Sequence, residues 1–209
     1  MALPVSDHRS GALRFGLGAS APAVLLAITL CGCSFDLSLW SSAPEKEAPA
    51  KAAAAETGSG DAQAATTRGQ ALAKSGKTEE ALAEFDKAIA IDPHYADALY
   101  NRGLLYQRQR QHQLAIDDFT SANGLTPQRA EPLLGRAISY IAMDKFKEAA
   151  ADLDEAVQAD PQNAQIWSAH GLAYERLGDK DKAEVSYGRA LAIRPKDEAA
   201  RSGLARVGG

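Results

Sequence analysis

The chain has 209 residues, of which 45% are hydrophobic and 24% are charged, and its formal net charge is −4. These values fit one globular domain. A mildly acidic chain without clustered Lys and Arg cannot neutralise many phosphates, which argues against a nucleic-acid-binding protein. Both cysteines, Cys31 and Cys33, lie near the N-terminus, so we expect no disulfide framework in the rest of the chain.

Residues 1–32 have the pattern of a secretory signal peptide. Arg9 and Arg14 precede an apolar run over residues 21–30, and a small residue follows soon after it. The run is too short to span a hydrocarbon core, which needs about 20 apolar residues. A basic flank, a short apolar segment and a small residue at its end together predict export.

The apolar run ends in Leu30-Cys31-Gly32-Cys33. This junction resembles the lipobox of bacterial lipoproteins, in which a small residue directly precedes the acylated cysteine. Gly32 fits that place before Cys33, whereas Leu30 is too large for it before Cys31. The resemblance therefore implies cleavage after Gly32 and acylation of Cys33. Two or three acyl chains anchor a protein stably, because each buried CH₂ contributes about 0.8 kcal/mol. An ordinary signal peptide with an incidental cysteine is the alternative.

The lipidated Cys33 and a disordered tether are predicted over residues 33–61. Ser34 is similar to the residue found after the cysteine in outer-membrane lipoproteins, which implies a cell-envelope protein at the outer membrane, facing the periplasm. Residues 34–60 are rich in Ala, Ser, Pro, Glu and Lys and are too polar to offset their ordering entropy. The apolar residues at the start of this segment are either linker or an interfacial foot beside the acyl chains: Phe35, Leu37, Leu39 and Trp40.

A period of 34 residues organises the rest of the chain, since prolines recur at Pro93, Pro127, Pro161 and Pro195. Within each period, small residues occupy places eight, twenty and twenty-seven. Large apolar or aromatic residues occupy places four, eleven and twenty-four. Internal repetition of this length is typical of a solenoid. Counting places from Ala62 divides the repetitive part into four units: 62–95, 96–129, 130–163 and 164–197.

This pattern resembles the tetratricopeptide repeat (TPR) in its period, its small and aromatic residues and its prolines. The resemblance implies an all-α fold, a right-handed TPR solenoid of four helix-turn-helix repeats. Two antiparallel helices need small residues where their axes cross most closely, and places eight and twenty supply them. Residues 198–209 are expected to form a short capping helix and tail, with Leu204 and Val207 covering the fourth unit.

The ends of the helices are marked unevenly. Asp61 precedes the first unit, and Asp144 and Asp179 are candidate N-caps for the second helices of units three and four. In unit two, Asn123-Gly124 stands where the other units have Ile, Val or Leu followed by Ala or Gln. We therefore expect the second helix of unit two to end early.

Two places of the repeat vary together. An acidic residue is present at place twenty-three in each unit that has Arg at place seven, and the fourth unit lacks both. We predict three interhelical ion pairs of structural function, because antiparallel helices bring these places close together: Arg68 with Glu84, Arg102 with Asp118, and Arg136 with Asp152, against His170 and Ser186 in the fourth unit.

No arrangement of residues indicates catalysis, so we expect a protein that is not an enzyme and needs no cofactor and no metal. His94, His112 and His170 fall at different places of different units, which fits surface or interhelical positions better than a ligand set. Most acidic residues recur at places that face solvent.

The concave face of such a solenoid is its natural binding surface, and here it is apolar. An exposed apolar stripe of this density indicates a partner site, either for a helix or extended segment of another protein or for a second copy of the chain. The alternative is that some of these residues pack between units or under the terminal helix. Chaperone-binding TPR proteins hold a C-terminal carboxylate with Lys and Asn on this face. Because Glu131 and Tyr100 stand where Lys would be needed, we reject that role despite Asn101. The predicted groove residues are Tyr100, Leu104, Leu134, Ile138, Ile141 and Leu172.

The TPR module and the predicted membrane location together imply a membrane-anchored scaffold or adaptor for protein–protein interaction in the bacterial cell envelope. TPR lipoproteins with this layout recruit cell-wall enzymes or envelope assembly machinery. The alternative is a dedicated assembly factor of a pilus or secretion system, similar to pilus lipoproteins. A pilus gene cluster around the gene would favour this alternative.

Overall fold

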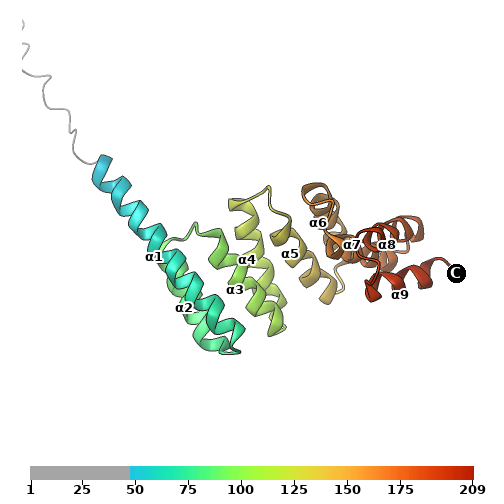
Figure 1. Ribbon diagram of the computed structural model, residues 1–209, viewed down its shortest axis with the longest axis horizontal. Helices are drawn as coiled ribbons and strands as arrows, with labels where there is room; N and C mark the ends of the chain where they lie inside the picture. The colour runs from blue at the N-terminus through green and yellow to red at the C-terminus, as the bar shows by residue number, and fades with distance from the viewer. Residues whose placement is uncertain (1–47) are drawn as a thin grey trace, which may run out of the picture. The chain divides into compact units, whose positions relative to one another are not determined.

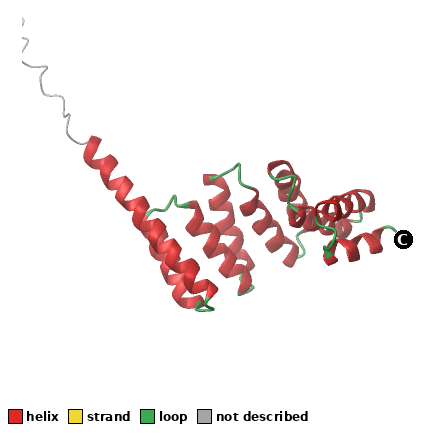
Figure 2. Cartoon of the chain, in the orientation of Figure 1, coloured by secondary structure: helices red, strands yellow, loops and turns green. Residues whose placement is uncertain are grey.

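The structure is a computed structural model that describes residues 48–209. Within this range the chain forms nine α-helices and no strand (Figures 1 and 2). No helix in the described part combines the length and the apolar character needed to cross a membrane. The helices are α1 (Ala48–Lys74), α2 (Thr78–Ile91), α3 (Ala96–Arg108), α4 (His112–Leu125), α5 (Ala130–Ala142), α6 (Phe146–Ala159), α7 (Ala164–Leu177), α8 (Lys180–Ile193) and α9 (Glu198–Val207).

The helices pack in pairs that follow the predicted units, so the predicted all-α repeat fold is confirmed. Each first helix contacts the second helix of its own pair and that of the preceding pair. First helices also contact one another along the series α1, α3, α5, α7 and α9, whereas α2, α4, α6 and α8 make no contact with one another within residues 48–209. The first helices therefore line the inner face of the solenoid, and the second helices form its outer face.

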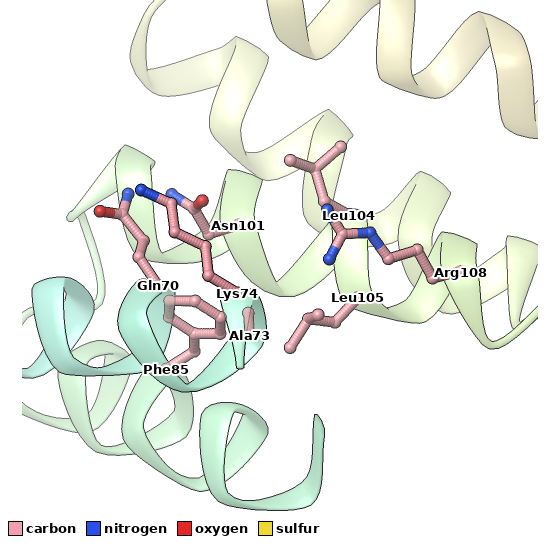
Figure 3. Close-up of a pocket in the computed structure, with 8 residues that line it drawn as sticks. All are labelled: Gln70, Ala73, Lys74, Phe85, Asn101, Leu104, Leu105 and Arg108. Carbon is pink, nitrogen blue, oxygen red and sulfur yellow. The ribbon is translucent and has the colours of Figure 1, made fainter. Parts of the chain in front are cut away.

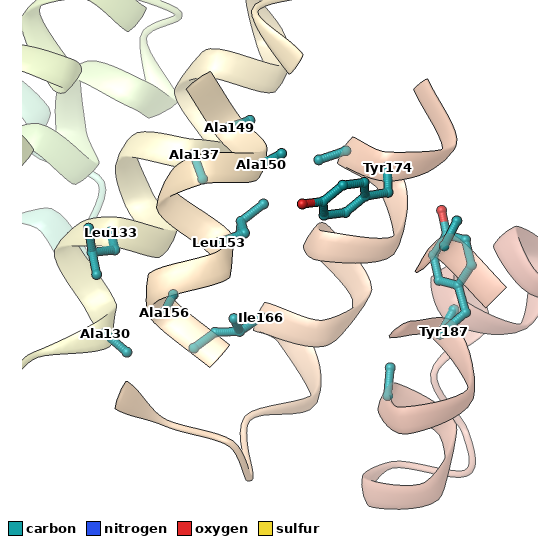
Figure 4. Packing of buried hydrophobic residues seen from close by; sticks show 14 of the residues in the cluster. Ala130, Leu133, Ala137, Ala149, Ala150, Leu153, Ala156, Ile166, Tyr174 and Tyr187 are labelled. Atoms are coloured by element: carbon teal, nitrogen blue, oxygen red, sulfur yellow. The ribbon is translucent and has the colours of Figure 1, made fainter. Parts of the chain in front are cut away.

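In units one, two and four the core contains a ring at place twenty-four that faces glycine. Phe119 is buried, and a methyl group at Gly135 of the next unit would lie only 2.7 Å from its Cζ atom. Tyr187 takes the same role at the end of the solenoid, where a methyl group at Gly203 of α9 would lie 2.2 Å from its Cζ atom. Helix α9 thus occupies the position of the first helix of a fifth unit. Figure 4 shows the buried side chains of units three and four, with Tyr187 among them.

The beginning of α1 differs from the sequence expectation. The helix begins at Ala48 and not after Asp61, so residues 48–60, which the composition predicts to be disordered, are helical. The segment contains the Ala52–Ala55 run, and Pro49 falls in the first turn, where its missing N–H breaks no hydrogen bond. Adding residues to an existing helix needs no new nucleus, so the glycines at 58 and 60 do not end it.

Two further expectations about helix ends are wrong. Helix α4 has 14 residues, as α2, α6 and α8 have. The Asn123-Gly124 pair therefore does not shorten it, and a side chain at Gly124 would meet open space. Asp144 does not cap α6, because it adopts a positive φ in the turn and the N-cap is Lys145. Asp179 does cap α8, since its side chain accepts a hydrogen bond from the Lys182 N–H.

The three predicted ion pairs between places seven and twenty-three are confirmed. The Arg136 guanidinium donates two hydrogen bonds of 2.7 Å to the Asp152 carboxylate. Arg102 donates bonds of 2.8 and 2.7 Å to Asp118, and Arg68 donates one bond of 2.9 Å to Glu84. Burial raises the pKa of the Asp118 carboxyl, and the hydrogen bond from Arg102 opposes that shift.

Two of these arginines, Arg102 and Arg136, also reach the preceding unit, which the sequence analysis did not anticipate. Arg102 donates a further hydrogen bond of 2.7 Å to Asp86, and Arg136 donates one of 3.1 Å to the hydroxyl of Thr120. Both partners stand at place twenty-five of the preceding unit. One side chain therefore joins the two helices of a unit and ties that unit to its neighbour.

The fourth unit makes the same bridge with a different residue. His170 is buried, its Nδ1 lies 2.7 Å from the Ser186 hydroxyl, and its Nε2 lies 2.9 Å from Asp154. Asp154 stands at place twenty-five of the third unit. The imidazole thus replaces the guanidinium, and the smaller serine replaces the acid. The His170 prediction of an interhelical role agrees with this geometry.

The turn between the helices of each unit contains one residue with positive φ at place fifteen. In units one and four it is Gly76 (φ 79°) and Gly178 (φ 83°). In units two and three it is Arg110 (φ 61°) and Asp144 (φ 57°). A side chain with a Cβ is strained in this region, Asp less than most. Arg110 is therefore the most strained of the four turn residues.

Removing the acid of a buried bridge should cost far more stability than removing that of an exposed one. Asp152→Ala leaves Arg136, whose side chain is only 16% exposed, without its main partner. We expect the free energy of unfolding to fall by about 2–3 kcal/mol. Glu84→Ala is the matched control, because its Arg68 partner is 50% exposed, and it should cost less than about 1 kcal/mol. Urea unfolding followed by circular dichroism gives both values, and equal losses would contradict a stabilising role for the buried bridge.

Relieving the strain at Arg110 should stabilise the protein. Arg110→Gly is expected to raise the free energy of unfolding by about 1 kcal/mol, because glycine adopts a positive φ without a steric penalty. Gly178→Ala, which introduces a Cβ at the same place of the fourth unit, should lower it by about the same amount. Thermal and urea unfolding measure both changes. If both substitutions shift the midpoint in the same direction, turn strain is not the cause.

Candidate functional site

The inner face of the solenoid carries the predicted groove residues, but it does not present them as one continuous stripe. Ile138 and Leu172 come together in one pocket, and Leu104 lies in a different one. Leu134 and Ile141 are half-buried and pack against the core of units three and four. These two residues therefore contribute to packing between units as well as to the inner face.

Tyr100 lies between the core and Arg129, the residue directly before α5. Its ring centroid is 5.8 Å from that of Phe119, and the Arg129 guanidinium lies 5.9 Å above the ring. Burial raises the pKa of the Tyr100 hydroxyl, Glu131 raises it further, and Arg129 opposes both. Arg129 also forms an ion pair with Asp97. Tyr100 thus forms part of a packed junction between units two and three.

The first pocket, which we call the α1/α3 pocket, has a volume of about 250 Å³ (Figure 3). Its floor is apolar, and Leu104 is the predicted groove residue that it contains. Polar side chains stand around the floor, and the polar ends of Gln70, Lys74 and Asn101 gather on one side in Figure 3, with the Arg108 guanidinium on the other. The pocket is lined by Gln70, Ala73, Lys74, Phe85, Asn101, Leu104, Leu105 and Arg108.

The second pocket, the α5/α7/α9 pocket, has a volume of about 360 Å³ and is mainly apolar. Ile138 of α5 and Leu172 of α7 face it, and the capping helix α9 supplies a wall with Ala199 and Ser202. The capping helix therefore shapes the inner face in addition to covering the core. The lining residues are Ile138, Gln165, Ser168, Ala169, Leu172, Tyr187, Ala199, Ser202 and Arg206.

A polar network holds the α9 wall of this pocket in position. Arg206 of α9 donates hydrogen bonds of 2.6 and 2.9 Å to the Glu175 carboxylate of α7, and the Tyr187 hydroxyl donates one of 2.6 Å to the same group. These bonds lower the pKa of Glu175, that from Arg206 having the larger effect. Burial and the contact with Glu175 raise the pKa of Tyr187.

A second polar contact fixes the middle of the inner face. The Gln107 side-chain amide of α3 donates hydrogen bonds to the Gly135 carbonyl at 2.9 Å and to the Ser139 hydroxyl at 2.8 Å, both in α5. Ser139 is buried. Adjacent first helices are therefore tied directly across the groove, which keeps the inner face rigid.

The sequence analysis singled out none of these polar residues. Lys74 and Arg108 both stand at place thirteen, and this shared place is the signal that could have found the α1/α3 pocket. The contribution of α9 was missed because its residues follow the last unit, where the repeat offers no pattern for an inner face.

One arrangement looks like a hydrolytic triad but lacks an accessible nucleophile. Ser186, His170 and Asp154 are joined in a line by hydrogen bonds. Ser186 is only 1% exposed, and its hydroxyl donates to the Lys182 carbonyl. A substrate cannot reach such a serine, so the three residues form a structural bridge. Among the residues whose side chains are described, no group of three His, Cys, Asp or Glu is placed to hold a metal ion.

Sequence-family models match the part of the chain that carries these helices. A model described as "TPR repeat" matches residues 69–109, and two described as "Tetratricopeptide repeat" match residues 96–129 and 134–200. No curated protein sequence matches the chain.

Solved TPR structures have a similar arrangement of helices. The MamA protein is 20% identical with a TM-score of 0.65, and the match covers 70% of this chain and 80% of that one. YrrB, described as a TPR protein with an unusual peptide-binding site, is 22% identical with a TM-score of 0.64, over 77% of this chain and 82% of that one. The first TPR of Spaghetti, bound to an HSP90 peptide, is 26% identical with a TM-score of 0.53, over 54% of this chain and 90% of that one. The chain is therefore a tetratricopeptide-repeat protein, and its described part folds as an all-α TPR solenoid.

Proposed function

We propose that this TPR protein is a membrane-anchored scaffold of the bacterial cell envelope, which binds a segment of a partner protein on the inner face of its solenoid. TPR solenoids are in general protein-interaction scaffolds without enzymatic activity of their own. Two similar solved structures are described with a bound peptide or a peptide-binding site, which supports a peptide as the type of ligand.

The observation that carries the binding role is the α5/α7/α9 pocket. An apolar pocket of about 360 Å³ on the inner face can enclose one large side chain of a partner. Its polar rim, with Gln165, Ser168 and Ser202, can hydrogen-bond to the backbone around that side chain. The bonds from Arg206 and Tyr187 to Glu175 keep the pocket wall in place, so less ordering entropy is lost on binding.

The proposed membrane location rests on the N-terminal junction, where Cys33 follows Gly32. Cys33 lies outside the described residues, so the support for a lipid anchor is the resemblance of this junction to the bacterial lipobox. A lipid on Cys33 would hold the solenoid at a membrane surface, where it could concentrate a partner protein near the envelope.

Ile138 should be a contact residue for the partner. Ile138→Asp places a carboxylate in the apolar pocket, so a peptide selected for binding to the wild-type protein should bind at least tenfold more weakly, about 1.4 kcal/mol. The helical signal and the melting temperature should change little, because Ile138 is only half-buried. Fluorescence anisotropy measures the affinity, and circular dichroism measures the fold.

Val185→Asp is the matched control for this change. Val185 lies on α8, on the outer face, and is 62% exposed, so its replacement should leave peptide affinity unchanged. If Ile138→Asp unfolds the solenoid, the residue belongs to the core and the binding role is wrong. If the fold and the affinity are both unchanged, the partner binds elsewhere.

The lipid anchor has its own test. Cys33→Ala should abolish incorporation of a clickable fatty acid and move the protein from the membrane to the soluble fraction, because no other acyl chain would hold it. Cys31→Ala should leave both acylation and membrane association intact. Acyl labelling that persists in Cys33→Ala would rule out the assignment of this cysteine.

A further inference from the structure

We infer that the partner segment carries an acidic side chain, Asp or Glu, that binds between Lys74 and Arg108 in the α1/α3 pocket. This inference rests on the proposed function, since it names the chemistry of the segment that the inner face would hold. It concerns a different pocket from the apolar one, and it can fail while peptide binding itself stands.

The charge of the α1/α3 pocket carries the inference. Lys74 is the last residue of α1, Arg108 is the last residue of α3, and both are exposed. Among residues whose side chains the structure describes, neither forms an ion pair, whereas Arg102, Arg136 and Arg206 all do. Two cations face one pocket in a chain whose net charge is −4, so an anion would find a local field opposite in sign to the whole molecule.

The same place differs in the other two units. Place thirteen is Ala142 in unit three, and in unit four it is Arg176, whose guanidinium lies 5.8 Å from the Phe146 ring centroid. Two cations from this place therefore line one pocket only where units one and two meet. A ligand with one acidic side chain and one large apolar side chain would have a defined direction along the inner face, with its acid toward α1 and its apolar side chain toward α9.

A role in helix stability does not account for the two cations. A basic residue near a helix C-terminus contributes about 0.3–1 kcal/mol through the helix dipole. However, α2, α4, α5, α6 and α8 have no basic residue in their last turn. These five helices end without a cation, whereas α1, α3, α7 and α9 have one in the last turn. A dipole contact leaves the charge available to a ligand.

The amides of the pocket can hold the peptide backbone beside the acidic side chain. The Asn101 amide donates a hydrogen bond of 2.6 Å to the Asp97 carbonyl, which fixes the side chain and leaves its oxygen as an acceptor. Gln70 adds a second amide. The amide oxygens can accept hydrogen bonds from backbone N–H groups of the segment, and the remaining amide N–H groups can donate to its carbonyl or carboxylate oxygens.

This pocket is distinct from the carboxylate site that the sequence analysis rejected. That site would need Lys where Tyr100 and Glu131 stand. Tyr100 packs against Phe119, and Glu131 is exposed. Lys74 and Arg108 instead lie at the C-terminal ends of their helices, and the apolar floor beneath them includes Leu104 and Leu105.

The experiment is a selection from a random twelve-residue peptide library, displayed with its C-termini fused and therefore without free carboxylates, on the full-length protein in detergent. Enriched peptides should contain Asp or Glu at a fixed distance from a large apolar residue. For a synthetic, amidated peptide from this set, replacing the acid by its amide should weaken binding about tenfold at low salt. The loss should shrink as salt is added, because screening weakens the contact.

The charge-reversed variant Lys74→Glu/Arg108→Glu should reverse the selection and enrich Lys or Arg at the same position. The matched control is Lys87→Glu/Arg189→Glu, which changes the charge equally at two exposed positions on α2 and α8 and should keep the acidic preference. The losses of binding free energy caused by Lys74→Ala and by the acid-to-amide change in the peptide should not add when both changes are combined. Such non-additivity would show that Lys74 and the acidic side chain interact.

Several outcomes would overturn the inference. The inference is wrong if the enriched peptides show no preference for acidic residues, or if that preference persists after charge reversal. Either result is compatible with the proposed peptide-binding role. If binding depends on Lys74 and Arg108 but requires a free peptide C-terminus, the bound group is a terminal carboxylate and not an acidic side chain, and the inference is wrong. A failure to enrich any peptide would instead count against the proposed function.

Discussion

The structure depends on the close approach of helices across a buried ring. Phe119 can lie between its own unit and the next only because Gly135 has no side chain there. Tyr187 meets Gly203 of α9 in the same way. Through rings of this kind, a unit makes apolar contact with the first helix that follows it. Each unit thereby buries a face that it could not bury alone. Because the first helices approach one another in this way, their remaining faces form a continuous inner surface.

Charged bridges add specificity to this apolar core. Arg102 and Arg136 each connect the two helices of a unit and the second helix of the unit before. A planar guanidinium can serve both partners at once because it presents donors in several directions. His170 has two ring nitrogens that point to opposite sides, so it can make the same bridge with Ser186 and Asp154. The substitution at this place in the fourth unit therefore preserves the geometry of the junction.

The packing also decides which inner-face residues remain free to bind. Leu134 and Ile141 are drawn into the contacts between units, and Tyr100 is covered by Arg129. What stays open is a pair of pockets with different chemistry, one apolar and closed by α9, the other bordered by Lys74 and Arg108. A surface with two unlike pockets can select a partner segment by both its side chains and its direction.

The sequence by itself determined the repeat, because its period and its small and large places are local and recur four times. It also indicated the Arg–acid bridges within units, since Arg and acid vanish together in the fourth unit. It could not reveal the second partner of Arg102, the wall that α9 adds to a pocket, or the loss of Leu134 to packing between units. Those features depend on how far each unit rotates against the next, and that rotation is set by contacts such as Gly135 with Phe119. Only the tertiary structure decides these contacts, because they join residues of different units and no pattern in the sequence shows that these residues are neighbours.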